Sequence, residues 1–261
     1  MPEVESGGCR LSYLVEGPAD APPLLLINSL GTTTDLWAAQ IPNLRRSFRV
    51  VRYDTRGHGR SDVSAPPYTI DNLGRDALAV LDAAGIARAH VAGISIGGLT
   101  AIWLGLEASD RVGKLVLSNT AARIGSAEVW SDRIATIEAN GLPVIVEGML
   151  ERWFTPDFHQ RDPLTVNAFR SVLLDGRTAG YLGCCAALRD ADLRDDLARI
   201  TAPTLVIAGR DDVATSPADA EFLRDRIPGA RMVTLAAAHL SNVEQPTAFT
   251  NVVVDFLSSE A

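Results

Sequence analysis

The first 120 residues alternate between short apolar runs and longer amphipathic segments. Helical spacing of apolar residues extends from Ile70 to Ala84, where Gly85 is a typical helix stop. Strands are predicted at residues 11–16, 23–28, 48–53, 89–93 and 114–118. After Pro203 the alternation resumes, with strands expected at 204–208 and 231–235 and helices at 217–226 and 247–257. This order is typical of an α/β fold with a mostly parallel sheet covered by helices on both faces.

The alternation stops between residues 119 and 192. Amphipathic helices are expected there at 126–140, 143–153, 163–175 and 178–188, and no strand stands out. Loops without secondary structure rarely exceed about 12–15 residues in compact domains. We therefore expect a single domain over 1–261, with a core formed by 1–120 and 193–261 and a helical cap inserted at about 121–192, over the carboxyl ends of the strands. The alternative is that these helices simply extend the core.

Charge and cysteine content narrow the class of protein. The net charge is −8 and no basic cluster occurs, which argues against nucleic acid or an anionic membrane as a partner. Cys9 and the adjacent pair Cys184 and Cys185 do not suit a disulfide framework. The first residues are acidic, and no apolar run approaches the ~20 residues that span a bilayer. We expect a cytoplasmic protein that acts on a small molecule, with the oligomeric state left open.

A candidate nucleophile lies in the pentapeptide Gly93–Gly97, which reads GISIG between a predicted strand and a helix-compatible stretch. A serine at such a strand-to-helix turn needs small residues two positions before and after it, and Gly93 and Gly97 supply them. The helix start directs free N–H groups at the reacting carbonyl. Ser95 is therefore predicted to be a nucleophile. The alternative is a glycine-rich turn with an incidental serine.

A serine nucleophile needs a base and an orienting acid, which follow it in the chain order Ser, Asp or Glu, His. Of the four histidines, His239 follows the last predicted strand and satisfies this order. The strand at 204–208 is followed by Asp211 and Asp212. We expect Asp212 to orient the histidine, and Asp211 to be a turn or helix-capping residue, although either carboxylate could reach the base.

The oxyanion of an acyl-transfer intermediate needs backbone donors. One is expected from the N–H of Ile96, directly after the nucleophile. The other is expected from the turn Asn28–Gly31 after an early strand, with Leu30 as the best candidate. The sequence has no phosphate loop and no metal-ligand spacing, so no cofactor and no metal are expected.

Over nearly its whole length the chain resembles the α/β-hydrolase superfamily, through GISIG, the turn that ends at Asp212 and AAHLSN around His239. Four further segments resemble the 3-oxoadipate enol-lactonases of bacterial aromatic catabolism: YDTRGHGRSD, NTAARIGSAEVW, RWFTPDF and CCAALRDADL. The resemblance implies an eight-stranded sheet, the triad Ser95, Asp212 and His239, and oxyanion donors at Leu30 and Ile96. The chain departs from many relatives at Asn28 and Ser29, where they carry His-Gly.

The same resemblance implies hydrolysis of a carboxylated enol-lactone to 3-oxoadipate in the β-ketoadipate pathway. The substrate carboxylate needs a cation in a largely apolar pocket. Candidates are Arg133 and Arg123, with Trp130 and Trp153 as walls, although exposed arginines and core tryptophans are commoner.

Other activities remain open for this set of residues. A general carboxylesterase or lactonase, a haloperoxidase-like enzyme and a carbon–carbon bond hydrolase would use the same triad. Dehalogenases and epoxide hydrolases of this fold need an aspartate nucleophile, which Ser95 excludes. An alternative of another class is a ligand receptor without catalytic activity.

Overall fold

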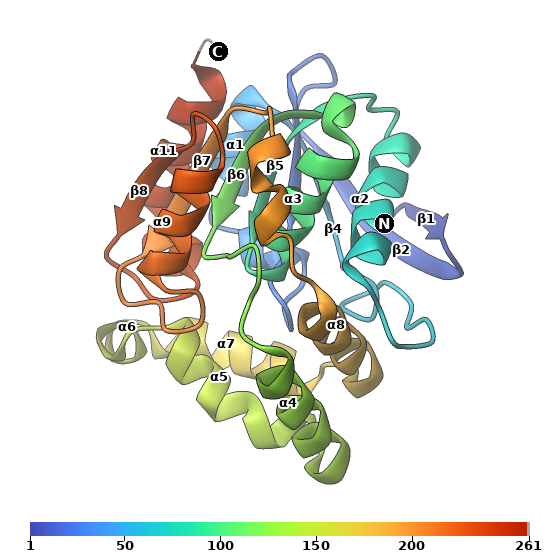
Figure 1. Cartoon of the computed structure of the whole chain (residues 1–261), viewed down its shortest axis with the longest axis vertical. Helices are drawn as coiled ribbons and strands as arrows, with labels where there is room; N and C mark the ends of the chain where they lie inside the picture. The colour runs from blue at the N-terminus through green and yellow to red at the C-terminus, as the bar shows by residue number, and fades with distance from the viewer. Residues whose placement is uncertain (260–261) are drawn as a thin grey trace.

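The computed structural model describes residues 1–259, and within them eight strands form one sheet in the order β1-β2-β4-β3-β5-β6-β7-β8 (Figure 1). The strands are β1 (Glu3–Ser6), β2 (Cys9–Glu16), β3 (Pro23–Ile27), β4 (Arg49–Tyr53), β5 (Ala89–Ile94), β6 (Val112–Ser118), β7 (Thr204–Gly209) and β8 (Arg231–Leu235). The pairs β1·β2 and β2·β4 are antiparallel, and the remaining neighbours are parallel. The carboxyl ends of β3 and β5 to β8 therefore meet at one edge, where the candidate residues follow them.

Helices cover both faces because each central strand is apolar on both sides. Leu24 and Leu26 of β3 enter the core shared with α1 (Ile41–Ser47) and α11 (Pro246–Ser258). Leu25, which points to the opposite face, enters the core shared with α2 (Ile70–Ala83), α3 (Ile96–Glu107) and α9 (Pro217–Arg226). This change of face at every residue is the period of a strand. The sheet is thus the middle layer of three.

A block of helices without a strand separates β6 from β7 in the described residues 119–203. Its helices are α4 (Ala127–Asn140), α5 (Val146–Trp153), α6 (Pro156–Arg161), α7 (Pro163–Leu174) and α8 (Thr178–Asp190). They gather at one end of the molecule, at the bottom of the view in Figure 1. Trp130, Met149 and Trp153 of this block belong to the same hydrophobic core as Leu30 and Ile96. The helices are therefore packed against the edge of the sheet where its strands end.

Most predicted elements agree with the structure to within a few residues. The helix at 217–226 and the strand at 231–235 have the predicted bounds, while the helix predicted at 143–153 begins as a 3₁₀ turn, Leu142–Ile145, before α5. Four strands or α-helices of the described residues were not predicted: β1, α1, α6 and α10 (Ser241–Glu244). Each is short, and β1 reads EVES with no fully buried residue. Its pairing with β2 fixes it, rather than its own apolar pattern.

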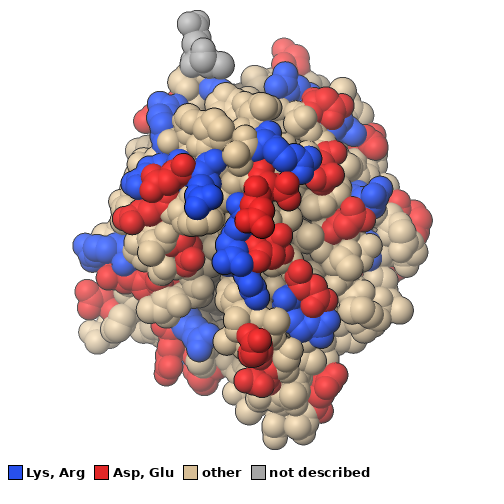
Figure 2. Space-filling view, viewed as in Figure 1, with Lys and Arg blue, Asp and Glu red and all other residues tan. Residues whose placement is uncertain are grey.

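The visible surface carries both signs of charge, interspersed over most elements (Figure 2). Many of these groups pair locally, as Arg75 does with Asp71 and Arg194 with Asp192. Within residues 1–259 no helix combines the length and the apolarity needed to cross a bilayer.

Candidate active site

The loop between β5 and α3 holds Ser95 in an unusual conformation. Its φ is 59° and its ψ is −122°, a region that non-glycine residues rarely occupy. A Cβ at Gly93 would collide with the backbone of Gly97, and a Cβ at Gly97 with the carbonyl of Ile27, so both positions require glycine. Backbone strain of this kind costs about 1–3 kcal/mol and is common at functional sites. The turn therefore lies at the carboxyl edge of the sheet in a shape fixed by its two glycines.

His239 and Asp212 form a buried pair beside this turn. The Nδ1 atom of His239 lies 2.9 Å from Oδ2 of Asp212, and both side chains are almost fully buried. Asp212 follows β7 and His239 follows β8, as predicted from the strand pattern. Asp211 instead points to solvent and pairs with Arg210 at 3.2 Å. The contact through Nδ1 leaves Nε2 of His239 available toward the pocket.

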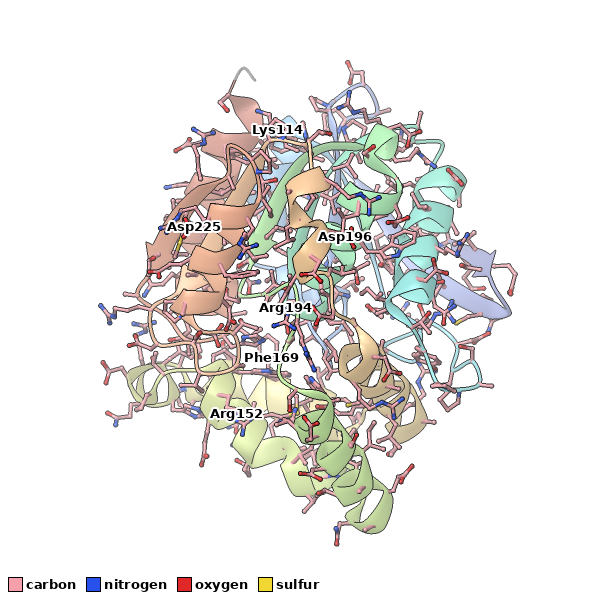
Figure 3. The ribbon with its side chains drawn as sticks, in the orientation of Figure 1. Lys114, Arg152, Phe169, Arg194, Asp196 and Asp225 are labelled. Carbon is pink, nitrogen blue, oxygen red and sulfur yellow. The ribbon has the colours of Figure 1, made fainter. Side chains whose placement is uncertain are left out.

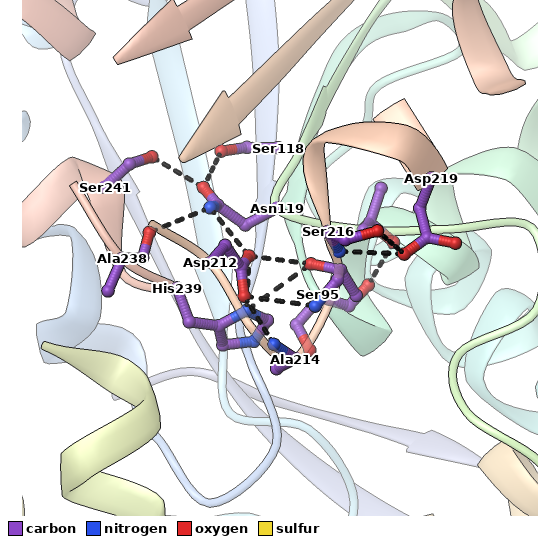
Figure 4. A network of polar contacts seen from close by, with 12 residues as sticks. Ser95, Ser118, Asn119, Asp212, Ala214, Ser216, Asp219, Ala238, His239 and Ser241 are labelled. Carbon is purple, nitrogen blue, oxygen red and sulfur yellow. Dashed lines mark hydrogen bonds and ion pairs between the residues drawn. The ribbon is translucent and has the colours of Figure 1, made fainter. Parts of the chain in front are cut away.

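Further donors surround the carboxylate of Asp212 (Figure 4). Oδ1 accepts the N–H groups of Ala214 at 2.8 Å and Thr215 at 3.0 Å. Oδ2 accepts the Thr215 hydroxyl at 2.8 Å and Nδ2 of Asn119 at 3.0 Å. Burial alone would raise the pKa of Asp212, but the charge of His239 and these hydrogen bonds outweigh it and lower the pKa to about 2. The carboxylate therefore stays ionised at neutral pH.

Ser95 and His239 line one pocket of about 210 Å³ together with Leu30. Ile96 is the first residue of α3, where a backbone N–H has no acceptor within the helix. The N–H of Leu30 has no acceptor among the described residues, whereas that of Gly31 donates to Nε2 of His58 at 3.0 Å. Leu30 and Ile96 thus each keep a backbone N–H without an acceptor among the described residues.

His58 supports this turn as a neutral acceptor. Its Nδ1 lies 3.1 Å from the carbonyl of Arg56, so the proton on Nδ1 leaves Nε2 to accept from Gly31. Burial lowers the pKa of His58 to about 4, which keeps the ring neutral at working pH. His58 lies in the segment YDTRGHGRSD, but its contact with the Asn28–Gly31 turn was not predicted.

Two arginines line the pocket, and its lining contains no Asp or Glu among the described residues. Arg133 lies over the Trp130 ring at 5.1 Å and donates to the Tyr181 hydroxyl at 3.4 Å. Arg152, which was not predicted, lies on α5 (Figure 3). It is exposed and lines the same pocket. Its position beside Trp153 in the chain was the available signal. The pocket thus offers positive charge without a competing carboxylate.

The remaining predicted pocket residues have different positions. Trp130 and Trp153 both line the pocket, as expected for walls, and Met149 and Val213 join them without having been predicted. Arg123 is not part of the lining, and its guanidinium lies 3.4 Å from Asp192. Arg123 is therefore paired outside this pocket.

A buried glutamate connects the loop of His239 to the helical block. The carboxylate of Glu244 accepts the N–H of Ala238 at 2.8 Å and the Thr155 hydroxyl at 2.7 Å. The N–H of Leu240 donates to the carbonyl of Trp153 at 3.1 Å. These hydrogen bonds therefore join the loop of the base to one wall of the pocket.

In the part of the chain that the structure describes, His, Cys, Asp and Glu side chains form no cluster of three or more that could hold a metal ion. The three cysteines are buried and unpaired by disulfides, and burial raises the pKa of Cys184 and of Cys185 far above that of a free thiol. Their thiols are therefore protonated at neutral pH and do not serve as nucleophiles there.

Comparison with known proteins shows the family and the fold of this chain. A family model described as the alpha/beta hydrolase fold matches residues 22–246. The 3-oxoadipate enol-lactonase 2 of Acinetobacter baylyi is 43% identical over 93% of this chain and 91% of that protein. The crystal structure of the enol-lactonase from Burkholderia xenovorans has a TM-score of 0.97 and 43% identity, covering 99% of this chain and 100% of that one. A hydrolase from Pseudomonas aeruginosa gives 0.95 and 47%, covering 98% and 97%.

Proposed function

This chain belongs to the alpha/beta hydrolase fold family and, within it, to the family of the 3-oxoadipate enol-lactonases, and we propose that it hydrolyses 3-oxoadipate enol-lactone to 3-oxoadipate. The observation that carries the proposal is the pocket itself. Ser95 and His239 open into a space lined by Arg133 and Arg152 and by no described carboxylate. Such a site suits an ester that carries a negative charge.

The first half-reaction forms an acyl-enzyme. The Oγ atom of Ser95 attacks the lactone carbonyl carbon while Nε2 of His239 takes its proton. The N–H groups of Leu30 and Ile96 hold the oxyanion. The bond to the ring oxygen then breaks, and His239 returns the proton to the departing enol oxygen. Ketonisation of the enol makes this step hard to reverse.

Water completes the second half-reaction. His239 takes a proton from water, whose oxygen attacks the acyl carbon, and the bond to Ser95 Oγ breaks as His239 returns the proton to it. Throughout, Asp212 remains ionised, because its pKa lies at about 2, and it stabilises the imidazolium without being protonated itself. The net change is the addition of one water molecule across the ester bond.

The helical block between β6 and β7 acts as the cap of this site, which assigns residues of about 121–192 to substrate recognition. One observation supports this role: its residues Trp130, Arg133 and Trp153 line the same pocket as Ser95 and Leu30. The guanidinium groups of Arg133 and Arg152 receive the substrate carboxylate, and the tryptophans exclude water from the ring.

The test is turnover of enol-lactone made in place from muconolactone by muconolactone isomerase, followed by loss of enol-lactone absorbance. We expect kcat/KM for this substrate to exceed that for p-nitrophenyl acetate by orders of magnitude, and Ser95→Ala to abolish both activities. Faster turnover of the acetate would make the protein a general carboxylesterase. Undiminished lactone hydrolysis by Ser95→Ala would refute the serine mechanism.

A further inference from the structure

Asn119, the first residue after β6, shares an unusual backbone feature with the proposed nucleophile. Among the described residues, Ser95 and Asn119 are the non-glycine positions with positive φ, and that of Asn119 is 45°. Asparagine tolerates this left-handed conformation better than most residues. Asn119 is 2% exposed and lies between the turn of Ser95 and the loop of His239 (Figure 4). The contacts of Asn119 must therefore explain why a buried polar residue adopts this backbone conformation here.

The side-chain amide of Asn119 is fully paired. Its Nδ2 donates to Oδ2 of Asp212 at 3.0 Å and to the carbonyl of Ala238 at 3.1 Å. Its Oδ1 accepts the hydroxyls of Ser118 at 2.9 Å and Ser241 at 2.6 Å. Because the carboxylate and the carbonyl can only accept, the NH₂ end must face them, and the amide has one orientation.

The backbone of Asn119 makes two further contacts that bear on the site. Its carbonyl accepts the N–H of Ser95 at 3.1 Å, and its N–H donates to the carbonyl of Ile207 in β7 at 2.8 Å. One residue thus contacts the turn of the nucleophile, the carboxylate of the acid and the residue before the base. These groups come from three separate strand ends, which no local segment of the chain could align.

We propose that Asn119 is a positioning residue that aligns Asp212 with His239, an inference that rests on the proposed function of those two residues. Oδ2 of Asp212 receives both Nδ1 of His239 and Nδ2 of Asn119. The Asn119 donor fixes the rotation of the carboxylate, and its bond to Ala238 fixes the loop that carries the imidazole. Without it, the carboxylate can turn toward Thr215, whose hydroxyl already contacts Oδ2.

Few charged groups share this network, which makes its titration interpretable. Asp212 accepts from Asn119 directly, and His239 contacts the same Oδ2 atom of Asp212. Glu244 approaches from α10 (Ser241–Glu244), where its carboxylate accepts the N–H of Ala238. Asp219 on α9 is engaged by Ser216. Removal of the Asn119 amide therefore acts chiefly on the Asp212–His239 pair.

The decisive variant is Asn119→Gly, because glycine accepts the positive φ and only the amide is lost. We expect kcat to fall about 10- to 100-fold, as loss of a hydrogen bond to a charged group predicts, with KM nearly unchanged. The acidic limb of the kcat profile should move to lower pH, because a poorly oriented carboxylate stabilises the imidazolium less. Asn242→Ala is the matched control, since it removes another buried amide, which donates to the Leu36 carbonyl.

A second variant tests charge at constant shape. Asn119→Asp replaces the NH₂ donor by an oxygen, so two carboxylates face each other and hold one proton between them. We expect the activity of Asn119→Asp to decline as the pH rises and the carboxylate pair loses that proton. This decline should begin at a lower pH than any decline in the activity of the wild type. Asn119→Ser would not test this effect of charge, because serine adds no carboxylate.

A spectroscopic readout separates this proposal from the proposed function. The Nδ1–H proton of His239 gives a far-downfield NMR signal when it is held by a carboxylate, and its titration needs no substrate. Asn119→Gly should move this signal, while Asn242→Ala lowers the Tm and leaves the signal unchanged. An unchanged NMR signal and an unchanged kcat in Asn119→Gly would overturn the positioning role. A wild-type protein that is inactive on the lactone but shows these shifts would refute only the proposed function.

Discussion

Replacing Asp212 by asparagine changes one atom and should disable the proposed base. The amide oxygen can take the place of Oδ1, which accepts two backbone N–H groups from Ala214 and Thr215. The NH₂ group then occupies the place of Oδ2, where Nδ1 of His239 and Nδ2 of Asn119 are both donors. Nδ1 of His239 must then accept a hydrogen bond from this NH₂ group, so the proton of the neutral imidazole moves to Nε2.

The wrong tautomer cannot take the proton of Ser95. In serine hydrolases this substitution lowers kcat about 10⁴-fold, which corresponds to about 5 kcal/mol of transition-state stabilisation. We expect a loss of this size on the enol-lactone, with KM nearly unchanged, because the Asp212 side chain does not line the pocket. Absorbance assays at high enzyme concentration can measure the residual rate, and circular dichroism shows that the variant is folded.

Asp211→Asn is the matched control, because Asp211 is exposed, adjacent in the chain and paired with Arg210. It should retain wild-type kcat. The reasoning is refuted if Asp212→Asn keeps kcat within about tenfold of wild type, or if Asp211→Asn shows the large loss instead. Either result would mean that the carboxylate 2.9 Å from Nδ1 does not set the tautomer.

Three further predictions concern acid stability, the substrate carboxylate and the oxyanion turn. The pKa of Asp212 falls from 3.8 to about 2 on folding. This shift contributes about 2 kcal/mol of stability above pH 4, which is lost as the pH falls through 2. Urea unfolding at pH 7 and pH 3 should therefore show a smaller pH dependence of stability for Asp212→Asn than for the wild type. Arg133→Met and Arg152→Met should each raise KM for the lactone about tenfold and hardly change it for p-nitrophenyl acetate, and equal changes on both substrates would argue against carboxylate binding. His58→Ala should lower kcat more than it raises KM, because Gly31 loses its acceptor, and His58→Gln should restore part of the rate; an effect on KM alone would contradict this.

Much of the fold followed from local patterns in the sequence. The helix at 217–226 begins with Pro217 after Ser216, whose side chain forms a capping box with Asp219, and these are local signals. The strand ends located Asp212 and His239 because the carboxyl ends of parallel strands meet at one edge. Strand β1 was missed because its four residues gain their structure from pairing with β2 and not from an apolar pattern of their own.

The parts of the site that were missed depend on contacts between distant residues. Asn119 reaches Asp212 across 93 residues and Ala238 across 119, so nothing near it in the chain indicates its role. Arg152 and Arg123 are both arginines close to tryptophans, and only the packing of the helices decides that Arg152 lines the pocket while Arg123 pairs with Asp192. Helix periodicity indicates which face of a helix is buried, but it does not indicate which cavity that face borders.

The bonds from Glu244 to Thr155 and from Leu240 to Trp153 limit how this protein can change its substrate. In a chimera whose helical block comes from a relative of different specificity, residues 153–155 would also come from that relative. The position of the His239 loop would then depend on those residues. Selectivity and turnover are therefore not independent modules here. Successful chimeras have to inherit the glutamate and its threonine partner together, and selection for a new substrate acts on the position of the base at the same time.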